Sequence, residues 1–336
     1  MTFPTLLRLF AHTQMLPILE SGEETLVGGQ AVMEGVMMRA PHSYCVAVRK
    51  GNGEIVADHA PIARMSEKYP ILKYPILRGV GTLGQAMSLG MRALKFSADA
   101  AMEEENAKKA ALQPGQPATK PPKPMPQWVM YLNIAVSLAF FLFLYKFVPL
   151  YLATSLGGFY PALQGHVAQG VVDGIIRILI FLGFLYGISR ARDIRRVFEY
   201  HGAEHKVVFN FESGQPVTVE NAQRFLTFHP RCGTSFLLVV MVISMLVYIL
   251  IPFDGFLAKF LSRIALLPLI TGLSYELIRF AAKRQGSFLA LLTAPGLWLQ
   301  RITTKPPSNQ QAEVAIQALD KAMALETSQG GQLIIA

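Results

Sequence analysis

The sequence has few charged residues for its length. Only 16% of its 336 residues are Asp, Glu, Lys or Arg, whereas soluble domains carry about 25%, and 52% of the residues are hydrophobic. This balance excludes an ordinary soluble chain and favours a membrane protein with a sizeable polar part. The net charge is +9, but the basic residues flank apolar runs. We therefore interpret them as determinants of orientation in a bilayer, and we expect no nucleic-acid partner.

Cysteine is also scarce, and several common signals are missing. Cys45 and Cys232 lie far apart, so we expect no disulfide framework and a reducing compartment. The N-terminal "MTFPTLLRLFAH" shows no small-residue cleavage site, so no signal peptide is predicted. A Walker-type phosphate loop is absent, which leaves nucleotide binding without support.

Four apolar runs are long enough to cross a bilayer, which takes about 20 residues. They comprise residues 133–156, 171–189, 235–251 and 260–282. The fold class that we expect is an α-helical polytopic membrane protein with about four transmembrane helices and a small α+β N-terminal cytoplasmic domain. A shorter run, residues 287–300, contains Pro295 and Gly296, which favour a re-entrant or interfacial segment.

The distribution of Lys and Arg predicts the orientation of these spans. Residues 157–170 contain neither, whereas residues 190–234 contain seven, and basic residues are enriched in cytoplasmic loops. We therefore place both termini and the His-rich loop 190–234 in the cytoplasm, with the lipid bilayer as the main partner. The oligomeric state is left open.

The polar segments flank the spans. "SYCVAVRK" and "GEIVADHA" alternate in polarity and meet around "GNG", which predicts a β-hairpin, and residues 75–105 are typical of an amphipathic helix. The predicted organisation is an N-terminal extension (1–25), a cytoplasmic α+β domain (26–112), a Pro-rich linker (113–127), a membrane domain (128–302) and a C-terminal cytoplasmic helix and tail (303–336).

One short motif, "EYHGAEHK", points to a metal. His201 and His205 are four residues apart, so a helix would place both imidazoles on one face, where they could bind one zinc ion. Glu204 lies near the same face and could activate a water molecule. The spacing His-x-x-Glu-His is that of inverted zinc proteases, although Gly202 disfavours a helix by about 1 kcal/mol.

A second motif in the same loop, "FHPRCGTS", supplies His229 and Cys232, whose spacing also suits zinc. The alternative is structural. In that case His229 orients the start of the third apolar run, and Cys232 packs as a small apolar group.

Three acidic residues lie in less polar surroundings. Glu276 is either a further metal ligand or, as we slightly favour, the ion-pair partner of Arg279 or Arg195. Asp173 and Arg177 are four apart in the second run, and we interpret them as an internal ion pair.

The third acidic residue, Glu34, lies in "GQAVMEGVMMR", among glycines and apolar residues. It is either catalytic or paired with Arg39, and the sequence leaves both possibilities open.

Taken together, "GGQAVMEGVMMR", "EYHGAEHK", "TVENA", "HPRCGTSF", "SYELIRFAAK" and "PGLWLQRITT" resemble the YqhQ-like family of bacterial membrane proteins, a family of unknown function. The resemblance covers about residues 26–319. It implies an integral protein of the bacterial inner membrane that depends on a metal. The motif residues that carry over are His201, Glu204, His205, His229, Cys232, Glu276, Glu34 and Arg39.

Two hypotheses follow. The first is a hydrolase in which zinc or another divalent metal is held by His201, His205 and a third ligand, with Glu204 as the base and a membrane peptide or lipid-linked molecule as the substrate. The second is a non-enzymatic assembly or scaffold factor with a structural metal or none. A transporter has less support, because we expect no half-broken helix pair.

Overall fold

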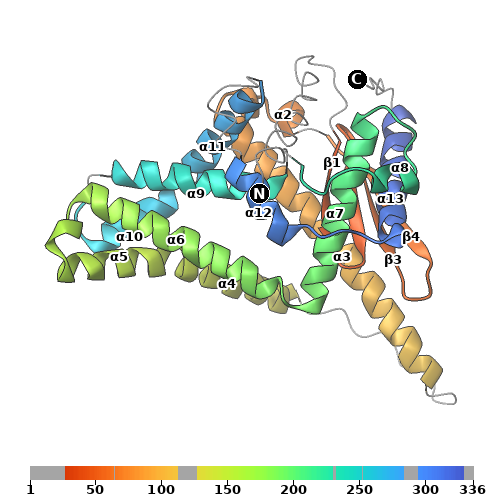
Figure 1. Ribbon diagram of the computed structural model, residues 1–336, viewed down its shortest axis with the longest axis horizontal. Coiled ribbons are helices and arrows are strands. Elements are labelled where there is room, and N and C mark those ends of the chain that lie inside the picture. Colours follow the sequence, from red (N-terminus) through yellow and green to blue (C-terminus); the bar gives the residue numbers. More distant parts are fainter. Residues whose placement is uncertain are drawn as a thin grey trace.

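The computed structural model describes residues 27–63, 65–112, 127–229, 232–251, 253–283 and 294–328. It consists of a polar part built around one β-sheet and a set of apolar helices that extend away from it (Figure 1). The predicted N-terminal extension, nearly all of the Pro-rich linker and residues 287–293 of the predicted re-entrant run lie outside the described residues.

The sheet has four antiparallel strands in the order β1-β2-β3-β4. They are β1 (Gly28–Val32), β2 (Gly35–Arg39), β3 (Ser43–Arg49) and β4 (Ile55–Pro61). The predicted hairpin around "GNG" joins β3 to β4. A second hairpin joins β1 to β2 through Met33 and Glu34, and Glu34 adopts a left-handed φ of 52°. The expected β-structure is thus confirmed as a single small sheet.

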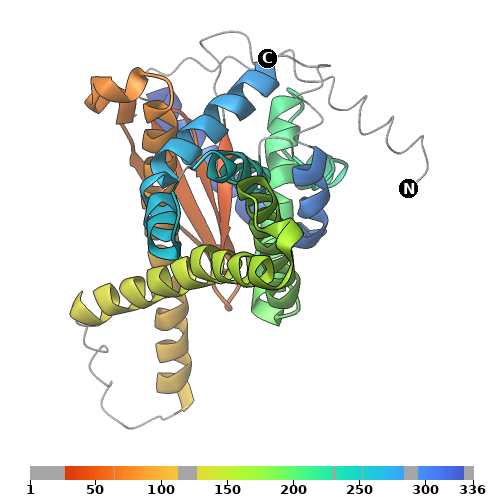
Figure 2. The same cartoon turned by 90° about the vertical axis from the view of Figure 1, so that its left-hand side faces the viewer.

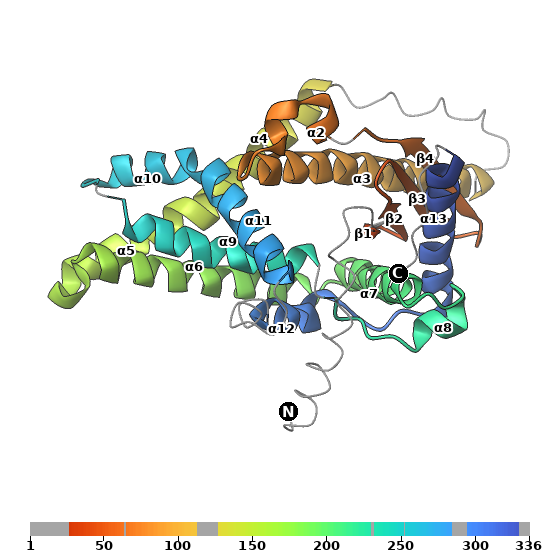
Figure 3. The ribbon, with the colours of Figure 1, turned by 90° about the horizontal axis from the view of Figure 1, so that it is seen from above.

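Helices cover both faces of the sheet, so the polar part is a three-layer sandwich. The helices of this part are α3 (Leu77–Leu112), α7 (Arg192–Glu212), α8 (Val219–Gln223) and α13 (Asn309–Ser328), with the short α2 (Met65–Lys68) and the 3-10 turn η3 (Pro70–Lys73) before α3. Helix α3 packs on one face, and α7 and α13 pack on the other (Figures 2 and 3).

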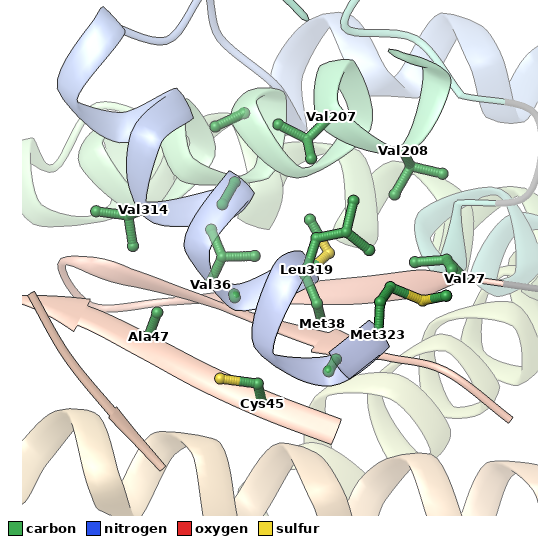
Figure 4. Close-up of a cluster of buried hydrophobic side chains, with 14 of the residues drawn as sticks. Val27, Val36, Met38, Cys45, Ala47, Val207, Val208, Val314, Leu319 and Met323 are labelled. Carbon is green, nitrogen blue, oxygen red and sulfur yellow. The ribbon is translucent and has the colours of Figure 1, made fainter. Parts of the chain in front are cut away.

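The alternation of side chains along the strands explains this arrangement. Met37 and Val46 are paired across β2 and β3 and face α3, whereas Met38 and Cys45 are paired one position further along and face α7 and α13. Since both sets are apolar and buried, helices cover both faces of the sheet at β2 and β3, whereas β4 at the edge keeps Asp58 and His59 exposed. Figure 4 shows the second set meeting apolar side chains of α7 and α13, among them Val207, Val208, Val314, Leu319 and Met323.

The layers combine segments from the whole chain. Helix α13 comes from the range 303–336, where a C-terminal helix and tail were predicted, and α7 and α8 come from the range 190–234 that was expected to be a loop between spans. The 21-residue helix α7 forms because one of its sides is apolar and packs against β1 and α13. Both histidines of the first motif lie on this helix and are therefore held by the sheet.

The apolar helices differ from the prediction in number. They are α4 (Gln127–Leu142), the π-turn η4 (Phe143–Phe147), α5 (Val148–Phe159), α6 (His166–Ile188), α9 (Gly233–Ile249), α10 (Phe256–Ala265), α11 (Leu267–Lys283) and α12 (Ala294–Thr303), and the 3-10 turn η5 (Pro161–Leu163) joins α5 to α6. Helices α5, α6 and α9 run side by side, away from the sheet (Figure 3).

Two helical stretches are long and apolar enough to cross a membrane: Ala135–Phe159, which combines part of α4 with η4 and α5, and His166–Ile188, which is α6. A bent pair raises the number to three. The expected count of four is therefore not reached among the described residues. Helix α9 has 17 residues, at the lower limit of the roughly 17–25 that a span needs, and it is shorter than the two helical stretches named above. Helices α10 and α11 meet at an angle of 50°, where Pro268, in the first turn of α11, interrupts the backbone hydrogen bonds. The expectation of no broken helix pair was wrong.

Candidate metal centre

Three of the residues singled out in the sequence come together at one point. The rings of His201 and His205 lie on the same side of α7, with their centroids 4.4 Å apart. Cys232, which immediately precedes α9, faces them. One ligand atom from each of the three residues lies within 4.8 Å of the other two. Helical spacing explains the first two positions, and the close packing of α9 and α12 places the third.

Backbone carbonyl groups fix the tautomers of both imidazoles. His201 Nδ1 lies 2.8 Å from the carbonyl oxygen of Thr303, and His205 Nδ1 lies 2.5 Å from that of Thr227. Because a carbonyl oxygen can only accept, each Nδ1 carries the proton, and each neutral ring has its lone pair on Nε2. This is the second-sphere arrangement that orients histidine ligands in metal sites.

The ligand spacing also fits a tetrahedral ion. The distance between His201 Nε2 and Cys232 Sγ is 3.3 Å, close to the roughly 3.5 Å that zinc–nitrogen and zinc–sulfur bonds subtend in a tetrahedral site. Burial lowers the pKa of His205, so its imidazole is neutral and available as a ligand near neutral pH. Among the described residues, the donor set for a metal is thus two imidazole nitrogens and one sulfur.

Glu204 lies beside this donor set. Its side chain is buried, and its Oε2 is 3.4 Å from His205 Nε2. Gly29 of β1 makes room for it, because a Cβ at position 29 would lie 2.6 Å from Glu204 Cγ. The glycine-rich motif at the N-terminus and the histidine motif on α7 are therefore in direct contact. A buried carboxylate next to a candidate cation is suited to hold a proton during hydrolysis.

His229 belongs to the surroundings of this group. Its ring centroid is 5.6 Å from that of His205, and its Nε2 lies 3.4 Å from a carboxylate oxygen of Glu212. Burial lowers its pKa to about 4, which keeps it neutral. The Gln300 side chain accepts a hydrogen bond from the backbone N–H of His229 and donates one to its carbonyl oxygen, at 2.7 and 2.8 Å. Gln300 thereby fixes the backbone of His229, three residues before Cys232.

The segment after α12 crosses α7 at Gly202. A Cβ at this position would lie 2.0 Å from the carbonyl oxygen of Lys305, and Lys305 N–H donates to the carbonyl oxygen of Phe198 at 2.9 Å. Gly202, which was counted against a helix, is thus the residue that lets this segment approach. The same segment delivers the Thr303 carbonyl group to His201.

Glu276 lies outside the three-residue group. It forms a two-pronged ion pair with Arg78 of α3, with 2.5 Å between Arg78 Nε and Glu276 Oε1. The structure thus supports the ion pair over the metal ligand, with a partner other than the predicted Arg279 or Arg195. Gly79 and Gly272 allow this close contact between α3 and α11.

Glu34 and Arg39 are also apart from the group. Glu34 pairs with Arg196 of α7, with both Nε–Oε1 and Nη2–Oε2 distances at 2.5 Å, and Tyr200 donates to it at 3.3 Å. Arg39 donates to Gln85 of α3 at 3.0 Å. Of the two possibilities left open for Glu34, the structure does not show the pair with Arg39; it shows two separate contacts instead.

Several residues of the site were missed in the sequence. Thr227 and Thr303 act through their carbonyl groups, which any residue type provides, so the identity of these residues does not point to this role. Gln300 and Thr303 do lie in the motif "PGLWLQRITT", and its resemblance to a family motif was the available signal.

The fold and this site define a class: a mostly helical protein in which a four-stranded sheet supports a His-His-Cys group beside two or three helices that could span a membrane. The chain belongs to the family described as "Protein of unknown function (DUF1385)", whose model matches residues 74–325. It is 36% identical over 313 residues to the uncharacterized protein YqhQ of Bacillus subtilis (strain 168), covering 89% of this chain and 92% of that protein. No solved structure matches the chain.

Proposed function

We propose that this protein is a metal-dependent hydrolase of the bacterial inner membrane, with its site at the cytoplasmic face. The observation that carries the proposal is the tautomer pattern. Both imidazoles have Nδ1 bonded to a carbonyl oxygen, which leaves Nε2 available as a ligand atom. His201 Nε2 lies 3.3 Å from Cys232 Sγ, and one ligand atom from each of the three residues lies within 4.8 Å of the others. A hydrogen-bond network without a metal would not require two imidazole nitrogens and a thiol to converge on one point.

The residues of the site would have two roles in this reaction, as metal ligands and as a general base. His201, His205 and Cys232 would hold the divalent cation, most simply zinc, and three protein ligands leave a fourth position open. The cation, when bound, would polarise a substrate oxygen and lower the pKa of water. Glu204 would accept the proton of the attacking water and return it to the leaving group, from a buried carboxylate next to His205.

The position of the site relative to the apolar helices supports the substrate class. Cys232 directly precedes the apolar helix α9, and α12, which carries Gln300, packs against α9. The seven basic residues between 190 and 234 favour a cytoplasmic location for this end. A site at the cytoplasmic edge of the bilayer would bind membrane peptides or lipid-linked molecules as substrates.

A non-enzymatic role is the second candidate, and the burial of the site favours it. His205 is 2% exposed, Glu204 6% and Cys232 8%, which suits a closed structural site. A shell completed by His229 would have four protein ligands and no position for water. The ion would then stabilise an assembly or scaffold factor.

Metal content tests the proposal directly. The full chain, purified in neutral detergent, should hold about one equivalent of zinc, and His205→Ala and Cys232→Ser should lose most of it. The matched control is His59→Ala, since His59 is exposed on β4. With Co²⁺ in place of zinc, the thiolate-to-cobalt absorption band should vanish in Cys232→Ser. Wild type without bound metal would contradict the proposal.

A Glu204→Gln variant separates the two candidates. It should retain the metal and lose roughly 10²–10⁴-fold in the hydrolysis of membrane-peptide or lipid-linked substrates. Full turnover by Glu204→Gln would refute the assigned base. A cobalt spectrum that shows four protein ligands, including an effect of His229→Ala, would favour the structural metal.

A further inference from the structure

A second buried polar cluster lies within the apolar helices, away from the metal centre. Asp173 and Arg177 of α6 form the predicted ion pair, and Arg263 of α10 donates to the other carboxylate oxygen of Asp173 at 2.5 Å. Lys146 of η4 donates to the hydroxyl of Tyr248 at 2.7 Å. All five side chains are nearly inaccessible, with Asp173 at 0%.

The charges of this cluster do not balance. Three cationic side chains, Lys146, Arg177 and Arg263, face one carboxylate, Asp173, among the residues that the structure describes. The ring of Tyr248 lies 4.8–5.2 Å from all three cations and offers partial compensation through its π-face. Buried charges without a counter-charge are strongly unfavourable, so this arrangement calls for a further negative charge.

Hydrogen-bond donors are in excess as well. The Nε of Arg177 is buried and has no acceptor within the described parts of the chain, although Arg177 Nη1 donates to Ser244 at 2.5 Å. Each guanidinium has five N–H donors and no acceptor. The described bonds of the Arg263 side chain use one nitrogen, Nη1. The cluster therefore has unused donors as well as unpaired charge.

A cavity opens beside Arg263 and Tyr248, whereas Lys146 and Arg177 do not border it. It is lined by Tyr248 and Arg263 and, among others, by Thr154, His166, Gln169 and Lys259. Its volume of about 20 Å³ is room for one water-sized group. Lys259 donates to Gln169 at 3.0 Å, and His166 lies 3.5 Å from the exposed carboxylate of Asp254. The cationic lining and the small volume together select a small anion.

Two irregular helices bring these residues together. The π-turn η4 carries Lys146 at the middle of the apolar segment Ala135–Phe159, and π-turns are frequent at functional sites. Arg263 lies near the end of α10, directly before the 50° bend into α11. Broken helices at this depth commonly surround ion sites.

We propose that Arg263 and Tyr248 of this cluster, together with Lys259, bind one small univalent anion of halide size in the cavity that they line. The anion neutralises part of the excess positive charge and accepts hydrogen bonds from the cluster. This site is independent of the metal centre and of the hydrolase proposal. Phosphate groups of lipids or phosphorylated ligands are too large to enter the cavity as a whole.

The test is anion-dependent stability of the full chain in neutral detergent. At constant ionic strength, replacing sodium gluconate with sodium chloride or bromide should raise the melting temperature saturably, by about 2–4 °C at tenfold excess over Kd. Arg263→Gln should abolish the rise, and the control Arg190→Gln, which removes an exposed cation just after α6, should preserve it. Equal melting temperatures of wild type in both salts would overturn the proposal.

A second variant keeps the test decisive if Arg263→Gln does not fold. Lys146→Met removes one excess cation, so its melting temperature should rise in gluconate and depend less on chloride. A purely structural Lys146 would instead lower the melting temperature equally in both salts, which overturns the proposal. Stabilisation by phosphatidylglycerol but not by chloride or bromide would overturn it too.

Discussion

The two buried polar clusters present opposite chemistry to a ligand. The group on α7 and before α9 offers lone pairs, because carbonyl groups occupy the Nδ1–H donors of His201 and His205. The cluster between α6, α9 and α10 offers N–H donors and excess positive charge around a single carboxylate, Asp173. The first suits a cation and the second an anion. Burial alone would not distinguish them, whereas the direction of the hydrogen bonds does.

The supporting structure differs in the same way. The lone-pair group is held by backbone carbonyl groups and by the sheet, so its geometry depends on close approach of segments distant in sequence. The donor cluster is held by its own charges, with Asp173 bonded to two guanidinium groups. A substitution that removes one charged side chain should therefore destabilise the donor cluster most. The geometry of the lone-pair group should instead be most sensitive to substitutions that displace the backbone.

The largest effect is expected from Asp173→Asn. The substitution keeps the shape of the side chain but leaves three buried cations without a carboxylate, so we expect a loss of about 3–5 kcal/mol of stability. Thermal unfolding in neutral detergent measures it. The control is Asp254→Asn, because Asp254 is 92% exposed and should change stability little. Equal stability of the two variants would show that Asp173 does not balance the cluster.

The sequence was sufficient where the determining contacts are local. Helical spacing placed His201 and His205 on one face, and the turn signal "GNG" placed β3 beside β4. The pair of Asp173 and Arg177 followed from the same spacing. Hydropathy found the apolar runs and predicted four spans, of which two, or three with the bent pair, are found among the described residues; it does not register the bend between α10 and α11.

The sequence was insufficient where partners are distant. Glu276 pairs with Arg78, 198 positions away, and the carbonyl group that orients His201 comes from Thr303, 102 positions away. Which arginine reaches a carboxylate depends on helix packing, in this case on the close contact of α3 and α11. The packing of α13 on the sheet was equally invisible, because its apolar side resembles that of any amphipathic helix.

A smaller effect is expected from Gly202→Ala, which tests the dependence of the candidate metal centre on close packing. The added Cβ would lie 2.0 Å from the Lys305 carbonyl oxygen, so the segment that carries the Thr303 carbonyl group must move. We expect a loss of about 1–3 kcal/mol of stability and a zinc affinity lowered about 10–100-fold through the disturbed orientation of His201.

The matched control is Gly183→Ala on α6, where no atom lies within 4 Å of the added Cβ. This variant should gain up to about 1 kcal/mol, because alanine favours a helix over glycine, and it should leave zinc affinity unchanged. Competition with a chelating dye measures the affinity. Wild-type zinc affinity in Gly202→Ala would show that the crossing segment does not support the site.

The smallest effect is a pH-dependent loss of stability caused by Cys45. It contrasts the thiol of Cys45, which lies in an apolar core, with that of Cys232, which faces imidazoles. Cys45 lies between β3 and α13 in an apolar core, and burial raises its pKa from 9.0 to about 12. The folded state keeps this proton while the unfolded chain loses it, so stability is complete below pH 9 and falls as the pH rises toward 12. At pH 10 the loss should be about 1.4 kcal/mol.

Denaturant unfolding at pH 8 and pH 10 measures this loss. Cys45→Ala should remove the pH-dependent part, whereas Val46→Ala, on the opposite face of the same strand, should lower stability at both pH values and keep the difference between them. If Cys45→Ala shows the same difference in stability between pH 8 and pH 10 as the wild type, the Cys45 thiol loses its proton in the folded state as readily as in the unfolded chain. Cys45 would then compete with Cys232 as a reactive thiol, and metal or alkylation data on the wild type could not be assigned to Cys232 without the Cys45→Ala background.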